Sequence, residues 1–179
     1  MAKKSSRDRN KLKELILYVA AKSERDPRFG ATKLNKILFY SDFAAYARLG
    51  ESITGETYQR LDHGPAPRGL LPAQRELEQE ASCAIAERDH FGRRQKRLVA
   101  LRDPDLGSFS GGEIALVDQV IDELWDHSAT EVSELSHLSL GWQLAAPGED
   151  IPYETVFVAS PRPLSPREIE HGRALRQAG

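Results

Sequence analysis

The chain has 179 residues, with 25 Lys or Arg against 27 Asp or Glu and a formal net charge of −2. This length suits one domain that buries its core without a metal or disulfide. The near-balance of charge excludes a chain that is basic throughout and binds polyanions over its whole surface. The single cysteine, Cys83, excludes an internal disulfide and a cysteine-based zinc site.

The cellular location follows from what the sequence does not contain. No stretch approaches the roughly 20 apolar residues of a membrane span. Residues 1–7 are basic and lack the apolar core of a secretory signal, so we expect them to form a disordered arm. We therefore expect a cytoplasmic protein without membrane contact.

Two helices are predicted in the first 50 residues. Residues 8–22 place apolar side chains at the spacing of a one-faced helix. Residues 32–49 are apolar around nearly the whole circumference, which is typical of a buried, central helix. Thr32 is the predicted cap of this second helix, and Gly50 is its predicted end.

Asp42 is the one acidic residue of the predicted central helix. A bare carboxylate among aromatic side chains is costly unless it is paired or hydrogen-bonded. One interpretation is structural: Asp42 bonds backbone groups or a nearby cation and fixes the helix register. The other is functional, a carboxylate held ready for a cation of a partner.

The decapeptide RLDHGPAPRG, residues 60–69, combines a histidine with two prolines and two glycines. A strand is predicted over residues 57–61, and Gly64 and Pro65 are expected to end it because proline cannot continue a ladder freely. A stiff turn holds His63 with little freedom left to lose, which suits a recognition residue. It suits equally a hydrogen bond that locks the corner.

A basic β-hairpin is predicted over residues 84–101, after a helix that Pro67 or Pro72 opens and that runs to about residue 82. One interpretation is a solvated ribbon whose charge discourages edge pairing. The alternative is the wing of a DNA-binding regulator. Its nucleic-acid contacts would come from the basic stretch 88–97 through Arg93, Arg94, Lys96 and Arg97.

Two more helices and a tail complete the chain. Ser110 and Glu113 form a capping box for a helix that ends near residue 127, and Thr130 begins a short helix that ends at His137. Residues 159–179 are predicted to be a proline-rich linker and a polar helix. The whole is predicted to be mainly α with a small antiparallel β element (α+β), a single compact helical domain over residues 8–158 with a β-hairpin.

No motif in the sequence nominates an active site. The five histidines show no metal-ligand spacing, and there is no glycine-rich phosphate loop. An enzyme would need Asp42, His63 and His137 to converge in a cleft. We therefore expect no catalytic activity, no cofactor and no metal.

The stretch KLNKILFYSDFAAYARLGESITGETYQRLDHGPAP resembles the Panacea domain, the family of SocA-like antitoxins and phage-associated proteins. Ala66 stands where the family usually carries valine. A second block, SELSHLSLGWQLAAPGEDIPYE, is similar to a later family motif through His137, Trp142, Ile151 and Tyr153. The matching positions of the first block are Lys33, Leu34, Lys36, Ile37, Leu38, Tyr40, Asp42, Phe43, Ser52, Ile53, Thr54, Gly55, His63, Gly64, Pro65 and Pro67.

This resemblance implies a bacterial antitoxin that neutralises a cognate toxin by direct protein contact. One branch of the family instead delivers its toxin to a protease, so a protease chaperone subunit is an alternative second partner. A homodimer stays open, and nucleic acid is expected only under the DNA-binding alternative. The expected partner-binding residues are Asp42, His63, Gly64, Pro65, His137 and Trp142.

Overall fold

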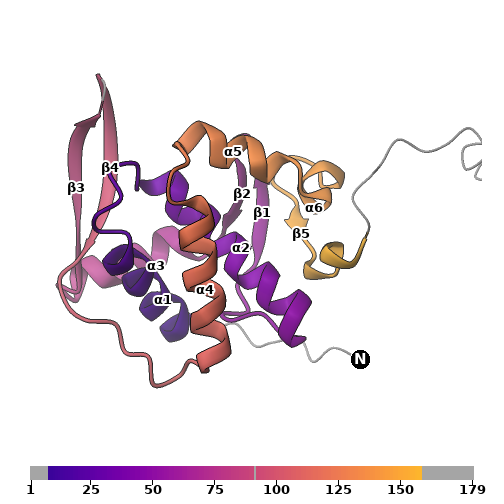
Figure 1. The fold of residues 1–179 in the computed structure, drawn as a ribbon, viewed down its shortest axis with the longest axis horizontal. Coiled ribbons are helices and arrows are strands. Elements are labelled where there is room, and N and C mark those ends of the chain that lie inside the picture. The colour runs from indigo at the N-terminus through magenta and orange to yellow at the C-terminus, as the bar shows by residue number, and fades with distance from the viewer. Residues whose placement is uncertain (1–7, 91, 159–179) are drawn as a thin grey trace, which may run out of the picture.

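The computed structural model describes residues 8–90 and 92–158 and arranges their helices around α2, with two small antiparallel sheets (Figure 1). This confirms the predicted fold class; the predicted arm 1–7 and the predicted linker and helix 159–179 lie outside the described residues. The helices are α1 (Arg9–Lys22), α2 (Ala31–Leu49), α3 (Leu70–Gln79), α4 (Gly111–Leu124), α5 (Ala129–His137), α6 (Leu140–Leu144) and the 3₁₀ helix η1 (Tyr153–Phe157). The strands are β1 (Tyr58–Leu61), β2 (Gly64–Pro67), β3 (Cys83–His90), β4 (Arg93–Ala100) and β5 (Asp150–Ile151).

Helix α2 is central, as its apolar circumference predicts: it contacts α1, α4, α5, β2, β4 and η1. It ends at Gly50, whose φ of 87° is the left-handed conformation that closes a helix. Its start differs from the prediction. The helix begins at Ala31 after Gly30, so Thr32 lies inside the first turn and Gly30 supplies no side-chain cap. No described helix is long and apolar enough to cross a membrane.

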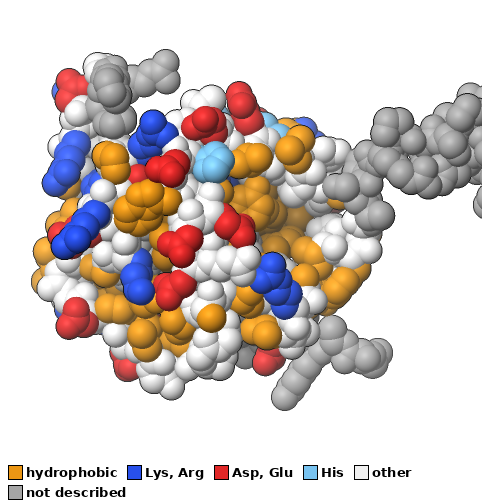
Figure 2. All heavy atoms as spheres, in the orientation of Figure 1, with side chains coloured by type: hydrophobic (Ala, Val, Ile, Leu, Met, Phe, Trp, Pro, Cys, Tyr) orange, Lys and Arg blue, Asp and Glu red, His pale blue; other side chains and the backbone are white. Residues whose placement is uncertain are grey.

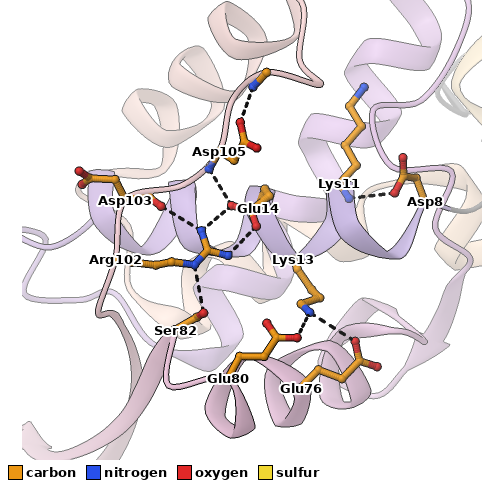
Figure 3. Close-up of polar contacts among 11 residues, drawn as sticks. Asp8, Lys11, Lys13, Glu14, Glu76, Glu80, Ser82, Arg102, Asp103 and Asp105 are labelled. Carbon is orange, nitrogen blue, oxygen red and sulfur yellow. Dashed lines mark hydrogen bonds and ion pairs between the residues drawn. The ribbon is translucent and has the colours of Figure 1, made fainter.

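Charged side chains fasten α1 to the elements on either side of it (Figure 3). Arg102, just after β4, donates to both oxygens of Glu14 at 2.8 and 2.6 Å, and the Asp105 N–H donates to the same carboxylate at 2.7 Å. Lys13 pairs with Glu80 near the end of α3. These ion pairs link α1 to the segment after β4 and to the end of α3.

The first sheet has the order β2-β1-β5 and carries the RLDHGPAPRG segment. The predicted strand is present as β1 and stops at Leu61, before Gly64, but residues 64–67 then form a second strand, β2, with Tyr58 opposite Pro67 and Leu61 opposite Gly64. Pro65 and Pro67 are tolerated because β2 is an edge strand, where missing N–H groups need not break a ladder. Phe39 and Phe43 of α2 pack against the ring of Tyr58, which seats the sheet on the central helix.

The β-hairpin predicted over residues 84–101 is confirmed, with β3 over Cys83–His90 paired to β4 over Arg93–Ala100. It projects beside α1 at the left of Figure 1. Leu98 is buried in the main core with Cys83 at the base of the hairpin. The base is therefore part of the core, whereas the two strands beyond it extend outward.

The remaining helices are capped much as their sequences indicate. The Ser110–Glu113 capping box is present at the start of α4. Helix α5 begins one residue earlier than predicted, because Ser128 and Glu131 form a second capping box. Helix α3 starts at Leu70, so neither candidate proline opens it.

Candidate functional site

The corner between β1 and β2, residues 61–63, lies at the surface, and α5 and α6 hold it through three consecutive backbone carbonyls. Trp142 Nε1 donates to the Leu61 carbonyl at 2.9 Å, and His137 Nε2 lies 3.1 Å from the Asp62 carbonyl oxygen. Ser133 Oγ donates to the carbonyl of His63 at 2.7 Å. A turn whose backbone is bound at every position keeps one shape, which is what a recognition surface needs.

The aromatic side chains of this corner also stack on one another. The rings of His137 and Trp142 are 4.0 Å apart at an interplanar angle of 21°. The Arg60 guanidinium lies 4.3 Å from the Trp142 ring and donates to the Ala145 carbonyl at 2.5 Å. The structure thus brings the two predicted residues of α5 and α6 together with the corner that contains His63.

Gly64 and Pro65 are both buried, so they support the corner from inside the protein and do not form its surface. Gly64 has a φ of 98°, and a Cβ there would lie 2.1 Å from Ser136 Oγ and 2.8 Å from Lys36 Nζ. Lys36 Nζ donates to the Pro65 carbonyl at 2.9 Å, and burial lowers the pKa of this lysine to about 8. These two predicted residues therefore shape the surface, whereas the exposed His63 is the one that a partner can touch.

Asp42 is 0% exposed, which agrees with its structural interpretation and leaves no surface for a partner. One carboxylate oxygen accepts the Thr54 N–H at 2.8 Å, and the other accepts Thr54 Oγ1 and the Tyr58 hydroxyl at 2.6 and 2.7 Å. Burial raises the pKa of Asp42 against these lowering hydrogen bonds. Its oxygens bond to the β1 side of the sheet and to neither histidine, so the three residues of the enzyme alternative do not share a hydrogen-bonded site.

The four basic residues of the hairpin have different environments. Arg97 is 4% exposed and donates to the carbonyls of Ser23, Asp26 and Glu24, so its prediction as a nucleic-acid contact is wrong. An inward-facing position on β4 explains this, since alternate strand residues point to opposite faces. Arg94 and Lys96 are exposed, and the side chain of Arg93 lies outside the described residues.

Sequence reasoning missed an apolar surface beside the corner. We call it the apolar groove: two adjoining hollows of about 290 and 200 Å³ that share Tyr40 and run over α2 between α4, α5 and η1. Figure 2 shows a hollowed patch of hydrophobic side chains on this face. Leu135 of α5 and Leu138, the residue that follows this helix, line the groove, and their spacing of three residues was the available signal. The large exposed apolar residues that line it are Leu135, Leu138 and Val158.

The fold and the corner at residues 61–63 define a small helical domain with a fixed turn at its surface. Among the described residues, no three His, Cys, Asp or Glu side chains gather to hold a metal ion. Residues 34–143 match the family described as antitoxin SocA-like, Panacea domain. This match covers more than half of the chain, so the protein belongs to that family, which gives it a role in toxin–antitoxin systems. No curated protein and no solved structure matches the chain significantly.

Proposed function

We propose that the protein neutralises a cognate toxin by direct contact through the apolar groove and the adjoining corner. The observation that carries this proposal is that Leu138, which lines the groove, is 65% exposed. Leu138 directly follows His137, one of the residues that hold the corner. Single exposed leucines need no explanation, but apolar side chains gathered around a hollow are typical of protein-interaction sites. The family supplies the class of partner, a toxin.

The groove and the corner would contribute in different ways. The groove accepts apolar anchors, which give most of the binding energy in protein interfaces. The corner adds a polar rim of fixed geometry, because its three carbonyls are already bonded within the protein. A surface ordered before binding has less conformational entropy to lose when the partner arrives.

The chemistry of the toxin segment follows from the groove lining. Tyr40, Leu116 and Leu124 form apolar walls, while Arg48 and Glu123 supply charges of both signs at one end. The segment would therefore present leucine- or phenylalanine-like anchors flanked by polar residues. Neutralisation by this contact makes and breaks no covalent bond in either protein.

The test is co-expression with the product of the neighbouring gene, scored by growth rescue and by the affinity of the purified pair. Leu138→Glu places a charge at the groove and should weaken binding at least about tenfold. Leu71→Glu is the matched control: Leu71 is 63% exposed on α3 and lines neither hollow. Full rescue by Leu138→Glu, or no complex with the unmodified chain, contradicts the proposal.

Blocking and delivery to a protease are two outcomes of the same contact, and the amount of toxin separates them. If the chain only occludes its toxin, an immunoblot shows the toxin at constant abundance in rescued cells. If the chain acts as an adaptor, the toxin disappears in rescued cells and persists when the protease is deleted. We propose occlusion, since the groove and corner supply a surface for one partner and need no second one.

A further inference from the structure

The strand β4 has one edge that β3 does not use, and the hydrogen-bond register identifies the residues that face outward from it. The Leu101 N–H donates to the Ser82 carbonyl at 2.9 Å, which makes this pair a hydrogen-bonded one. Hydrogen-bonded pairs alternate along an antiparallel ladder. Gln95 and Arg97 therefore bond to β3 through their backbone, whereas the N–H and C=O groups of Arg94 and Lys96 point to the open side.

The position of Gly30 confirms this direction independently. A Cβ built on Gly30, at the start of α2, would lie 3.3 Å from the Lys96 carbonyl oxygen. The carbonyl therefore points from β4 toward the body of the protein. Among the described residues, no hydrogen bond from outside the hairpin reaches the backbone N–H or C=O of Arg94 or Lys96.

A cavity of about 730 Å³ lies along this edge. Its walls are β4, the start of α2 at Gly30–Thr32, and the start of α5 at Ser128–Glu131. These elements meet at the upper left of Figure 1, between the projecting hairpin and α5. An unpaired strand edge is ordinarily covered or left to solvent, whereas this one faces a space with the volume of a ligand site.

The charge of the cavity selects what can enter it. Arg28, Arg94 and Lys96 contribute three positive charges, against one negative charge from Glu131, and the exposed Arg94 guanidinium also lies 3.7 Å from the Glu87 carboxylate of β3. Glu131 is already engaged, since it accepts the Ser128 N–H at 2.6 Å in the capping box of α5. Arg28 Nη1 donates to the Asp126 carbonyl, which holds the Arg28 guanidinium beside the cavity. The net charge of the lining is positive, so an acidic occupant is favoured.

We propose that an extended, acidic segment of a partner protein pairs with the open edge of β4 at Arg94 and Lys96 and forms a third strand within this cavity. Backbone hydrogen bonds would give the segment its affinity, as in other cases of strand addition to a sheet edge. Its acidic side chains would meet the basic walls. The proposal does not depend on the apolar groove or on the identity of the toxin.

Two other occupants fit the edge less well. A second copy of the hairpin would bring Arg94 and Lys96 of both copies together, and like charges on paired strands repel. A nucleic acid would need a continuous run of outward cations, but Arg97 is buried against the loop at residues 23–26. A short acidic strand needs only the three cations that already line the cavity.

The test uses the isotope-labelled full chain and a capped heptapeptide in which glutamate alternates with threonine and valine. We expect saturable shifts of the Arg94 and Lys96 amide signals, with binding in the range of about 1 mM. The same peptide with lysine in place of glutamate should bind at least about tenfold more weakly. Inorganic pyrophosphate is a third arm, and it reports whether charge by itself accounts for binding.

Two variants of Lys96 separate the contribution of its backbone N–H to peptide binding from the contribution of its charge. Lys96→Val and Lys96→Pro both remove the ammonium group, but only the proline removes the outward N–H, and an edge strand tolerates this change. We expect Lys96→Val to weaken the peptide about threefold and Lys96→Pro at least about tenfold, with melting curves confirming that both fold. If Lys96→Pro does not fold, Arg94→Pro paired with Arg94→Val makes the same comparison.

Three results would overturn the proposal. The first is an acidic peptide that shifts no amide of β4 at millimolar concentration. The second is equal binding by the valine and proline variants, because the edge N–H would then contribute nothing. The third is pyrophosphate that displaces the peptide and binds equally to both variants, which would make the cavity a simple anion site.

Discussion

The two hairpins of this protein are built alike at the base and differently at the tip. Each base is fixed by a buried charged side chain: Asp42 accepts the Tyr58 hydroxyl of β1, and Arg97 of β4 donates to the loop at residues 23–26. The tip of β1–β2 is then bound a second time by Ser133, His137 and Trp142. Beyond Arg97, β3–β4 is held mainly by its own strand pairing.

The difference shows that strand pairing alone does not decide whether a hairpin becomes a fixed surface or an open edge. Both hairpins satisfy their internal ladders, so the deciding contacts come from other elements. Helices α5 and α6 bind the carbonyls of the first turn, whereas no hydrogen bond from another described element reaches the outward backbone groups of Arg94 and Lys96, and a cavity lies between β4 and the starts of α2 and α5. Under the two proposals above, the first hairpin offers side chains to a partner, and the second offers its backbone.

The largest expected loss of stability comes from removing the side chain that anchors the base of the second hairpin. Arg97→Ala leaves the carbonyls of Ser23, Glu24 and Asp26 without their donor, so we expect the free energy of unfolding to fall by about 3 kcal/mol. Arg94→Ala, an exposed site on the same strand, should change it by less than about 0.5 kcal/mol. Urea denaturation followed by circular dichroism measures both, and equal losses would refute the assigned difference between base and tip.

A smaller effect is expected from the lysine beneath the first hairpin. The folded pKa of Lys36 is about 8 against an ordinary value of 10.5, so between these values the unfolded chain carries a proton that the folded chain has lost. Stability therefore rises with pH in this window. Relative to Lys36→Met, the free energy of unfolding of the unmodified chain should rise by about 2 kcal/mol between about pH 7.5 and about pH 10.

The subtraction matters for this experiment, because Tyr40 and other buried tyrosines also titrate at high pH. They are common to both proteins and cancel in the difference. Urea titrations at several pH values give the two curves. A difference that stays flat across the window would mean that the ammonium group of Lys36 is not desolvated in the folded protein.

The smallest expected loss of stability comes from removing one of the side chains that hold the turn of the first hairpin. Trp142→Ala removes the hydrogen bond to the Leu61 carbonyl and the stacking with His137, and we expect a loss of about 1.5 kcal/mol. Leu144→Ala is the control on the same helix, since Leu144 is 70% exposed and its change should cost less than about 0.5 kcal/mol. Hydrogen exchange of the amides at residues 61–64 should quicken only in the tryptophan variant.

Sequence patterns predicted the parts of the fold that repeat along the chain. The all-round apolar pattern of α2, the hairpin signal of residues 84–101 and the capping box at Ser110 each act over a few neighbouring residues, and each is present. Strands β2 and β5 were missed because one contains two prolines and the other has two residues. Their pairing to β1 comes from long-range contacts that no local pattern encodes.

The candidate site was predictable in position and less so in role. The motif residues His63, His137 and Trp142 do meet at one corner, although they are far apart in the sequence. For Asp42 the residue type left two interpretations open, and only the hydrogen bonds to Thr54 and Tyr58 decide between them. Composition did not distinguish Arg97 from its exposed neighbours. The face of the sheet to which a strand residue points depends on strand register, which composition does not encode.

At the corner, residues 61–63, the path of the backbone does not depend on which side chain stands at position 63. Main-chain oxygens at residues 61–63 hold the loop, so the imidazole of His63 is free of that duty. Under the proposed function, replacing this imidazole would alter what the loop recognises, while the backbone would keep its path. A protein family built on such a turn can acquire new targets by exchanging single residues at the rim, without redesigning the fold that presents them.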